Sequence, residues 1–146
     1  MNTVAQILAS KADQATYTIG PSATAHEAAH LMAEKNIGAL LVVENGKVVG
    51  IVSERDYARK LVLTARSPMD TPLGDIMSSP VMCVRPHQTS DECMALMTQN
   101  RLRHLPVMDH DQLMGLISIG DLVKATITEQ QFIIEQLEHY IIGQRG

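Results

Sequence analysis

Two stretches of the sequence, residues 50–56 and 115–121, each place a glycine, a serine and an aspartate at the same spacing. In each stretch the glycine opens an apolar run that predicts the end of a buried strand, and a helical pattern begins at the aspartate. A strand that runs into a helix N-terminus presents unpaired backbone N–H groups and the positive end of the helix dipole, which favour a phosphate. The serine adds a donor, and the aspartate can accept hydrogen bonds from a vicinal diol. The two stretches therefore predict two nucleotide sites.

The same residues also have a purely structural interpretation. An aspartate in the first turn stabilises a helix without any ligand, and a serine before it can act as an N-cap. The recurrence of Ser53 and Asp56 as Ser118 and Asp121 favours the binding interpretation over this simpler one.

An internal duplication explains the recurrence. Residues 17–59 align without a gap with residues 82–124 at a constant offset of 65, and ten aligned positions are identical. A second match, at a different offset, precedes the two copies and pairs Val4, Ile7 and Leu8 with Leu73, Ile76 and Met77. The duplication covers nearly the whole chain, so the fold is expected to consist of two similar units.

Each copy predicts the element order βαββα. A short extended piece, residues 18–19 or 83–84, is followed by a helix whose start is marked by a Thr-x-x-Glu capping box at Thr24 or Thr89. Two strand-like runs come next, at residues 39–43 and 47–52 in the first copy and 105–108 and 113–118 in the second. The Asn45-Gly46 pair predicts a tight hairpin between the first two runs. The second helix is expected to begin at the aspartate, and because one unit cannot cover its own sheet, the two units are expected to pack together.

The composition of the 146-residue chain narrows the classes of partner. Hydrophobic residues make up 45% of the sequence, the formal net charge is −4, and no block of Lys and Arg occurs, which argues against nucleic acid as a partner. The first ten residues lack the pattern of a signal peptide, and no apolar run is long enough to span a membrane. We therefore expect a cytoplasmic protein that does not bind membranes, in which Cys83 and Cys93 are reduced.

Residues 132–142 predict a further helix with one apolar face. Its apolar residues fall within an arc of about 120°, opposite Glu135 and Glu138. This stripe comprises Ile133, Ile134, Leu137, Tyr140 and Ile141. Such a face must be covered, either by this domain or by a second subunit, whereas the acidic polar face disfavours a membrane surface.

Taken together, these features resemble the CBS domain pair, or Bateman module. The resemblance rests on the duplicated βαββα unit, on Arg-His-Leu-Pro-Val at residues 103–107, and on Gly-x-x-Ser-x-x-Asp after each hairpin. It spans about residues 4–126. It implies an α/β (α+β) fold in which two units pack sheet to sheet with pseudo-two-fold symmetry. The expected division is 1–66 for the first CBS unit with an N-terminal helix, 67–127 for the second CBS unit, and 128–146 for the C-terminal amphipathic helix.

The resemblance also implies two clefts that bind an adenosine-containing ligand, which would be AMP, ADP, ATP, NAD or S-adenosylmethionine. In the first site, Asp121 would bind the ribose hydroxyls, Ser118 and the Gly120 backbone would lie near phosphate, and Arg103 and His104 would supply positive charge. Thr18 and Ile37 would complete this site beside the adenine. The second site would use Asp56, Ser53 and Arg55, with Cys83 and Leu102 as its apolar wall.

The two predicted sites are not equivalent. Where the second copy has Arg103-His104, the first copy has Gly38-Ala39, so the second site lacks two cationic side chains. Arg55 and Arg59 are the possible substitutes. We therefore expect the sites to differ in affinity or ligand, with the more highly charged phosphate chain at Asp121.

A further motif, His26-Glu27-Ala28-Ala29-His30, matches the H-E-x-x-H pattern of zinc proteases. On a helix, however, both histidines would point away from the apolar face formed by Ala28, Leu31 and Met32. No convincing third ligand follows in the sequence, so we predict no metal site here.

The sequence thus predicts a non-catalytic regulatory module, a homodimer that senses an adenine nucleotide and acts through an effector protein. The alternatives are a structural or adaptor homodimer whose clefts are vestigial and, less favoured, a zinc-dependent hydrolase built on His26 and His30.

Overall fold

The computed structural model describes residues 2–145 and the side chains of residues 2–142. The chain forms two compact units. Unit 2 runs from Thr16 to Met82, whereas unit 1 combines the residues up to Ala15 with those from Cys83 onward. We describe each unit by itself.

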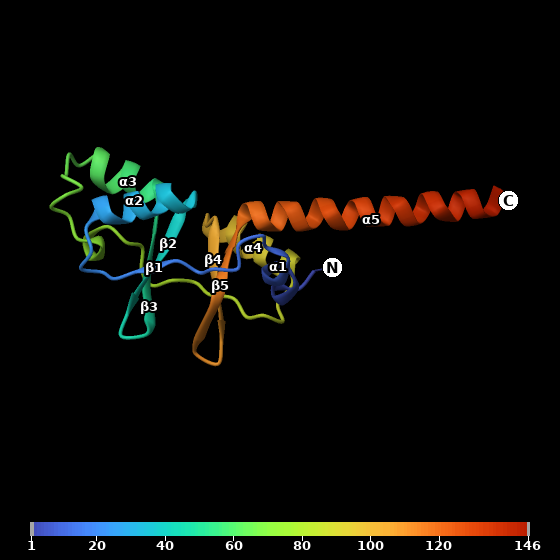
Figure 1. Ribbon diagram of the computed structural model, residues 1–146, viewed down its shortest axis with the longest axis horizontal. Helices are drawn as coiled ribbons and strands as arrows, with labels where there is room; N and C mark the ends of the chain where they lie inside the picture. Colours follow the sequence, from blue (N-terminus) through green and yellow to red (C-terminus); the bar gives the residue numbers. More distant parts are fainter. Residues whose placement is uncertain (1, 146) are drawn as a thin grey trace. The chain divides into compact units, whose positions relative to one another are not determined.

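Unit 2 contains the first copy of the repeat. Its elements are β1 (Thr18–Ile19), α2 (Ala25–Lys35), β2 (Ala39–Glu44), β3 (Lys47–Ser53), α3 (Glu54–Tyr57), the wide π turn η1 (Ala58–Val62) and the short 3-10 helix η2 (Leu73–Asp75) (Figure 1). The sheet has the order β1-β2-β3, with β1 parallel and β3 antiparallel to β2. The predicted βαββα order is confirmed in this unit.

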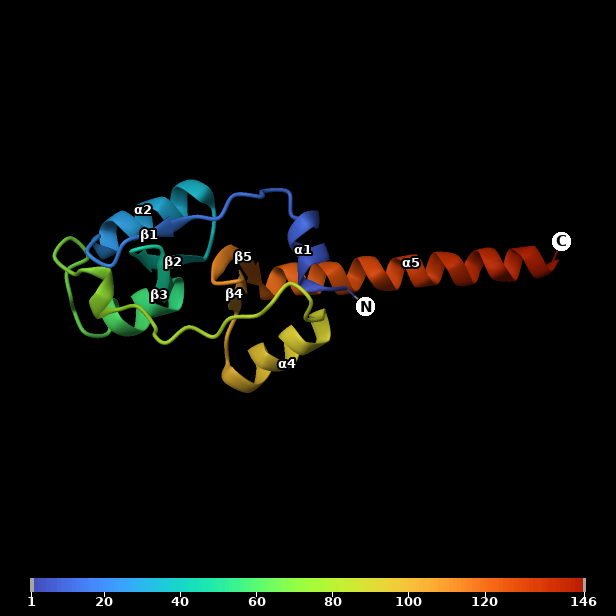
Figure 2. The same cartoon turned by 90° about the horizontal axis from the view of Figure 1, so that it is seen from below.

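Unit 1 contains the second copy. Its elements are α1 (Val4–Ser10), α4 (Ser90–Asn100), β4 (His104–Asp109), β5 (Gln112–Ser118) and α5 (Ile119–Arg145) (Figure 2). β4 and β5 form an antiparallel pair, and Val84 forms a parallel bridge to Val107. This bridge is the counterpart of the Ile19–Val42 pair in unit 2, so the second copy repeats the topology of the first.

The tight hairpins form where the sequence predicts them. Asn45 and Gly46 have φ angles of 52° and 76°, the left-handed region that a two-residue turn of this kind requires. His110 and Asp111 occupy the same positions in the second copy with φ angles of 48° and 63°. Both hairpins therefore use the same left-handed turn conformation, and the second copy adopts it without a glycine.

The threonines at the starts of the two long helices are N-caps. Thr24 Oγ1 accepts a hydrogen bond from the Glu27 N–H at 3.2 Å, and Thr89 Oγ1 accepts one from the Glu92 N–H at 3.2 Å. These bonds fix where α2 and α4 begin, as expected from the sequence.

The segment that precedes each copy packs against the core of the other copy. Val4 and Ile7 of α1 lie in the same buried cluster as Leu105 and Val107 of β4. In unit 2, Leu73 and Ile76 lie in the buried cluster formed by α2, β2, β3 and η1. The compact units therefore differ from the expected division between residues 66 and 67. The apolar residues before the first copy are buried by the second copy, and those before the second copy are buried by the first.

A close backbone approach accompanies each exchange. A Cβ atom added to Gly50 would lie 2.4 Å from the Met77 sulfur, and one added to Gly115 would lie 2.8 Å from a methyl carbon of Leu8. The glycine that opens each Gly-x-x-Ser-x-x-Asp stretch thus makes room for the leading segment of its unit.

The second helix of the second copy does not end before the C-terminal helix. Instead, α5 is one continuous helix of 27 residues, and it begins two residues before Asp121, just as α3 begins two residues before Asp56. The expected separate helix at residues 128–146 is therefore the distal half of α5, because nothing in residues 119–142 interrupts the helical hydrogen bonding. Figure 1 shows this half extending beyond α1 and α4 of its own unit.

Candidate ligand-binding site

The junction between β5 and α5 holds Ser118 and Asp121 together. The Ser118 N–H donates a hydrogen bond to Asp121 Oδ2 at 2.8 Å, and the Asp121 N–H donates one to Ser118 Oγ at 3.2 Å. The aspartate is thus the third residue of the helix and closes a reciprocal cap. The structural interpretation raised by the sequence is correct for this pair, and it leaves Asp121 Oδ1 without a hydrogen bond from any residue that the structure describes.

The junction between β3 and α3 repeats this geometry more tightly. The Ser53 N–H donates to Asp56 Oδ2 at 2.8 Å, and the Ser53 hydroxyl donates to the same oxygen at 3.2 Å. The Ser78 hydroxyl donates to the other oxygen, Oδ1, also at 3.2 Å. Asp56 is 7% exposed and belongs to the interior of unit 2.

Each aspartate faces a lysine, which sequence reasoning missed. Lys11 Nζ lies 3.1 Å from Asp121 Oδ2, and Lys60 Nζ lies 3.2 Å from Asp56 Oδ1. Lys60 is on the turn of helix that follows Asp56, so its spacing of four residues could have signalled the pair. Lys11 comes from the segment after α1, and no pattern in the sequence connects it with Asp121.

The start of each unit's first hairpin strand lies next to the helix junction. The Ile119 N–H donates to the Arg103 carbonyl at 2.8 Å, and the Glu54 N–H donates to the Gly38 carbonyl at 3.2 Å. His104 pairs with Ser118, and Ala39 pairs with Ser53. The structure therefore brings together Arg103, His104, Ser118, Gly120 and Asp121 in unit 1, and Gly38, Ala39, Ser53, Arg55 and Asp56 in unit 2.

His104 is half-buried, and its charge state follows from its surroundings. Burial lowers the pKa of its imidazole, the carboxylate of Asp121 acts in the opposite direction, and the cations of Lys11 and Arg103 lower it further. At neutral pH the side chain is therefore a neutral donor and acceptor rather than a fixed positive charge. Arg103 remains the permanent cation of the predicted pair.

We expect acid to destabilise the protein through His104. Because the folded-state pKa is lowered, the unfolded state binds more protons below its own pKa of about 6.5, and the free energy of unfolding falls as the pH drops through that region. Chemical denaturation of the wild type at pH 7.5 and 5.5 should show a larger loss than in His104→Gln. The exposed His139→Gln variant is the control and should keep the wild-type loss; a loss in His104→Gln equal to that of the wild type would contradict the assignment.

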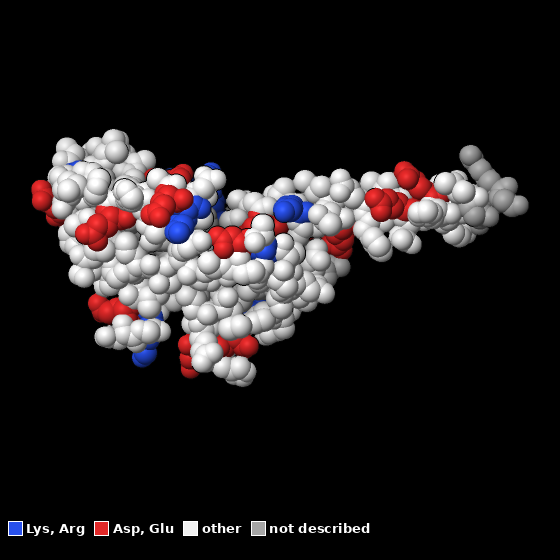
Figure 3. All heavy atoms as spheres, viewed as in Figure 1, with Lys and Arg blue, Asp and Glu red and all other residues white. Residues whose placement is uncertain are grey.

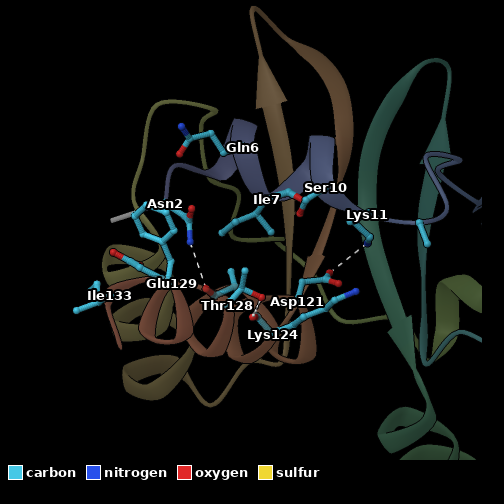
Figure 4. A pocket seen from close by; sticks show the side chains of 13 residues that line it. Asn2, Gln6, Ile7, Ser10, Lys11, Asp121, Lys124, Thr128, Glu129 and Ile133 are labelled. Carbon is cyan, nitrogen blue, oxygen red and sulfur yellow. Dashed lines mark hydrogen bonds and ion pairs between the residues drawn. The ribbon is translucent and has the colours of Figure 1, made fainter. Parts of the chain in front are cut away.

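Unit 1 has a groove of about 950 Å³ that includes Asp121 at one end (Figure 4). Its walls come from α1 with the residues that flank it and from the first half of α5, and it contains Lys11 and Lys124 as well as the apolar Ile7 and Phe132. In Figure 4 the Lys11 ammonium points toward the Asp121 carboxylate. Asp121 thus lines a cavity of a size that suits a small molecule.

Unit 2 has a smaller cavity of about 400 Å³, between α2 and the start of α3. It is lined by Ile37, Gly38 and Glu54 among others, and Asp56 is not part of its wall. Ile37, predicted as an apolar wall of the Asp121 site, lines this separate cavity of its own unit, and its place in the Asp121 site stays a prediction.

The other predicted site residues, Thr18, Cys83 and Leu102, lie outside the two strand–helix junctions. Thr18 is exposed on β1, where it pairs with Leu41. Cys83 is exposed, although partial burial raises the pKa of its thiol, and Leu102 is half-buried after α4. Each predicted site draws on both units, so its completion belongs to the proposal below.

The H-E-x-x-H motif lies on the outer face of α2. His26 and His30 are exposed, whereas Ala28 and Met32 are buried, which confirms the predicted orientation of this helix. His30 Nδ1 lies 3.9 Å from Glu34, a contact within the helix. Across the residues that the structure describes, no three His, Cys, Asp or Glu side chains are grouped so that they could hold a metal ion.

Comparison with known families decides which fold family these units represent. The sequence pattern described as "CBS domain" matches residues 12–63 and residues 73–127. The chain belongs to the CBS domain family. Each matched segment contains one copy of the repeat, so the protein contains a tandem pair of CBS units.

Curated relatives support the same membership. CBS domain-containing protein CBSX3, mitochondrial, of Arabidopsis thaliana is 39% identical over 125 residues, which cover 82% of this chain and 61% of that protein. The chain thus spans less than two thirds of this relative. No helix in the described part of the CBS pair is long and apolar enough to cross a membrane.

Solved structures show the same architecture. A candidate signal-transduction protein with CBS domains from Burkholderia ambifaria MC40-6 is 55% identical, with a TM-score of 0.85, and the match covers 88% of this chain and 96% of that one. The hexameric CBS-CP12 protein from bloom-forming cyanobacteria is 30% identical, with a TM-score of 0.75 over 84% of this chain and 70% of that one. The CBS domain pair of protein MJ0100, solved with 5′-methylthioadenosine and S-adenosyl-L-methionine, shares the fold at 22% identity, with a TM-score of 0.77 over 88% and 98% of the two chains.

Proposed function

We propose that this CBS pair is a non-catalytic regulatory module that binds an adenosine-containing ligand and passes the change to an effector protein. The observation that carries the proposal is the repeated junction of strand and helix. In both units an aspartate at the third helical position is held by its serine beside the first residue of a hairpin strand. A carboxylate at this place can accept from the two hydroxyls of a ribose, and the adjacent helix N-terminus favours phosphate.

For the site at Asp121, the roles follow from the chemistry of each group. Asp121 binds the ribose, Ser118 and the Gly120 backbone N–H lie toward phosphate, and Arg103 supplies the permanent positive charge. A side chain at position 120 would meet only Ser118 Oγ at 3.6 Å, so the space beside this glycine is open to a ligand. By the family resemblance, Thr18 and Ile37 complete this site around the adenine.

For the site at Asp56, the family resemblance adds Cys83 and Leu102 to Ser53, Arg55 and the backbone of Gly38 and Ala39. This site has no counterpart of Arg103, since Gly38 stands at that position. A ligand with a long phosphate chain is therefore assigned to Asp121.

The ligand classes are AMP, ADP, ATP, NAD and S-adenosylmethionine. The complex of the MJ0100 CBS pair with two adenosine derivatives supports this chemical class. Binding stabilises one conformation of the module by RT ln(1 + [L]/Kd), about 2.7 kcal/mol at a ligand concentration 100-fold above Kd. An effector that recognises this conformation would then respond to the ligand concentration.

A thermal-shift panel with AMP, ADP, ATP, NAD, NADH and S-adenosylmethionine tests the proposal. We expect at least one ligand to raise the unfolding temperature of the wild type by several degrees, and Asp121→Ala to abolish that rise while circular dichroism shows an intact fold. An unchanged response in Asp121→Ala would contradict the assignment of the site.

One observation favours the adaptor alternative, in which the clefts are vestigial. Both carboxylates already have partners within their own units, and Asp56 is nearly inaccessible. Absence of any shift across the whole panel would therefore support an adaptor that acts without a ligand.

We also propose that the protein is a homodimer and that the distal half of α5 forms the contact with the second copy. Its seven large apolar side chains between Phe132 and Ile142 are each between 50% and 66% exposed. Ile127, Ile134 and Ile141 recur every seven residues, the spacing of a coiled-coil seam, with Leu137 between the last two. On the face shown in Figure 3, uncharged atoms cover most of this half of the helix. A second copy can bury this seam against its own, as monomeric proteins rarely leave such a surface in water.

Light scattering coupled to gel filtration tests the homodimer. The double variant Ile134→Glu/Leu137→Glu should elute as a monomer, because it places two carboxylates in the seam. His139→Glu introduces one carboxylate on the opposite face of α5 and should remain dimeric. A dimeric double variant would show that the contact lies elsewhere.

A cellular compartment is named for one of the relatives described above. The name of the Arabidopsis relative assigns that protein to mitochondria. For this chain the cytoplasmic location stays a prediction.

A further inference from the structure

Both carboxylate oxygens of Asp56 are in contact with groups of its own unit. A carboxylate offers about four acceptor positions. Two on Oδ2 are taken by the Ser53 N–H and hydroxyl, and one on Oδ1 by the Ser78 hydroxyl. The Lys60 ammonium forms an ion pair with Oδ1 at 3.2 Å. A ribose could reach Asp56 only by displacing some of these groups.

The backbone of Ser78 is held in place beside Asp56. Its backbone exchanges two hydrogen bonds with Ile51 of β3, Ser78 N–H to the Ile51 carbonyl at 2.8 Å and Ile51 N–H to the Ser78 carbonyl at 3.0 Å. The preceding Met77 packs on Gly50, and Lys60 Nζ also donates to the Ile76 carbonyl at 2.9 Å. Ser78 and Lys60 are therefore held over the carboxylate by the backbone of unit 2.

Unit 1 has the same positions with a weaker closure. The Leu116 carbonyl, which corresponds to that of Ile51, accepts from Lys11 Nζ at 2.8 Å instead of from a backbone N–H. Asp121 accepts only on Oδ2, and its Oδ1 has no donor among the described residues. The Asp121 side chain is 22% exposed, compared with 10% for Asp56. The lysine at each site is partly exposed, 29% for Lys11 and 40% for Lys60, so the two sites differ in the access to the aspartate and in the Ser78 contact.

We infer that Ser78 and Lys60 are specificity-determining residues that close the Asp56 site to a ribose, so that the chain binds one adenosine ligand, at Asp121. In the bound state Lys11 exchanges the carboxylate for the ligand's phosphate or carboxylate. This inference rests on the proposed function. It assigns ligand binding to the unit that contains Asp121 and not to the unit that contains Asp56.

Native mass spectrometry counts the ligands bound per chain and tests the inference with AMP, ATP, NAD and S-adenosylmethionine as separate probes. We expect at most one adduct per wild-type chain with every probe, and its loss in Asp121→Ala. The variant Ser78→Ala/Lys60→Met removes both closing groups and should bind a second copy of the ligand. The control Ser67→Ala/Lys47→Met changes the same residue types at exposed positions of unit 2 and should keep one adduct.

The outcomes separate the inference from the proposed function. Two adducts on the wild type would overturn the inference alone. One adduct that is lost in Asp56→Ala but kept in Asp121→Ala would overturn the inference together with the assignment of the ligand to Asp121, and would leave ligand binding by the module intact. A single adduct in Ser78→Ala/Lys60→Met that shows an intact fold by circular dichroism would also overturn it. Absence of adducts in all variants with all four probes would overturn the proposed function, and the inference with it.

Discussion

Replacing Asp56 with alanine is expected to lower the free energy of unfolding by about 2–3 kcal/mol, because it removes a helix cap and leaves donors of a buried junction without an acceptor. Asp56 is 7% exposed, accepts hydrogen bonds from Ser53 and Ser78, and forms an ion pair with Lys60. The matched substitution Asp121→Ala should cost only about 1 kcal/mol, since it removes one cap and a partly exposed ion pair of small value.

Urea denaturation of the wild type and both variants measures this difference. Equal losses, or a larger loss for Asp121→Ala, would show that the dense hydrogen bonding around Asp56 contributes little. The result also bears on ligand binding, because a variant that is strongly destabilised cannot report on its binding site alone.

Replacing Ile76 with alanine is expected to cost about 2–5 kcal/mol, the range for truncating a fully buried aliphatic side chain. Ile76 lies just after η2, in the segment that precedes the second copy, and its side chain is 0% exposed. It packs in the core of unit 2 with residues of α2, β2 and β3.

Leu63→Ala supplies the control for this experiment. Leu63 lies between the same two copies but is 79% exposed, so its truncation should change the free energy of unfolding by less than about 0.5 kcal/mol. Similar effects of the two substitutions would show that the leading segment of the second copy is not part of the core of the first.

Local patterns were sufficient to predict the elements of both CBS units. The Thr24 and Thr89 caps and the Asn45-Gly46 turn depend on interactions within a few residues, which a sequence displays directly. The same holds for the pairing of Ser53 with Asp56 and of Ser118 with Asp121, whose bonds close over three positions.

Contacts between distant segments were not predictable in this way. Lys11 meets Asp121 across 110 positions of the chain, and Ser78 meets Asp56 across 22. The sequence does show that the segments before the two copies resemble each other, but it does not show which copy each segment covers. The unbroken course of α5 was also missed, because the apolar stripe of residues 132–142 is visible as a separate pattern.

The sequence by itself determined the repeat, the βαββα order and the positions of the two carboxylates, because periodicity, capping and turn chemistry act over short distances. Only the tertiary structure decided that one carboxylate is enclosed and the other has an available oxygen. That difference depends on which leading segment lies beside each strand–helix junction. The segments are held there by the burial of apolar side chains, Ile7 in the core of the second copy and Ile76 in the core of the first.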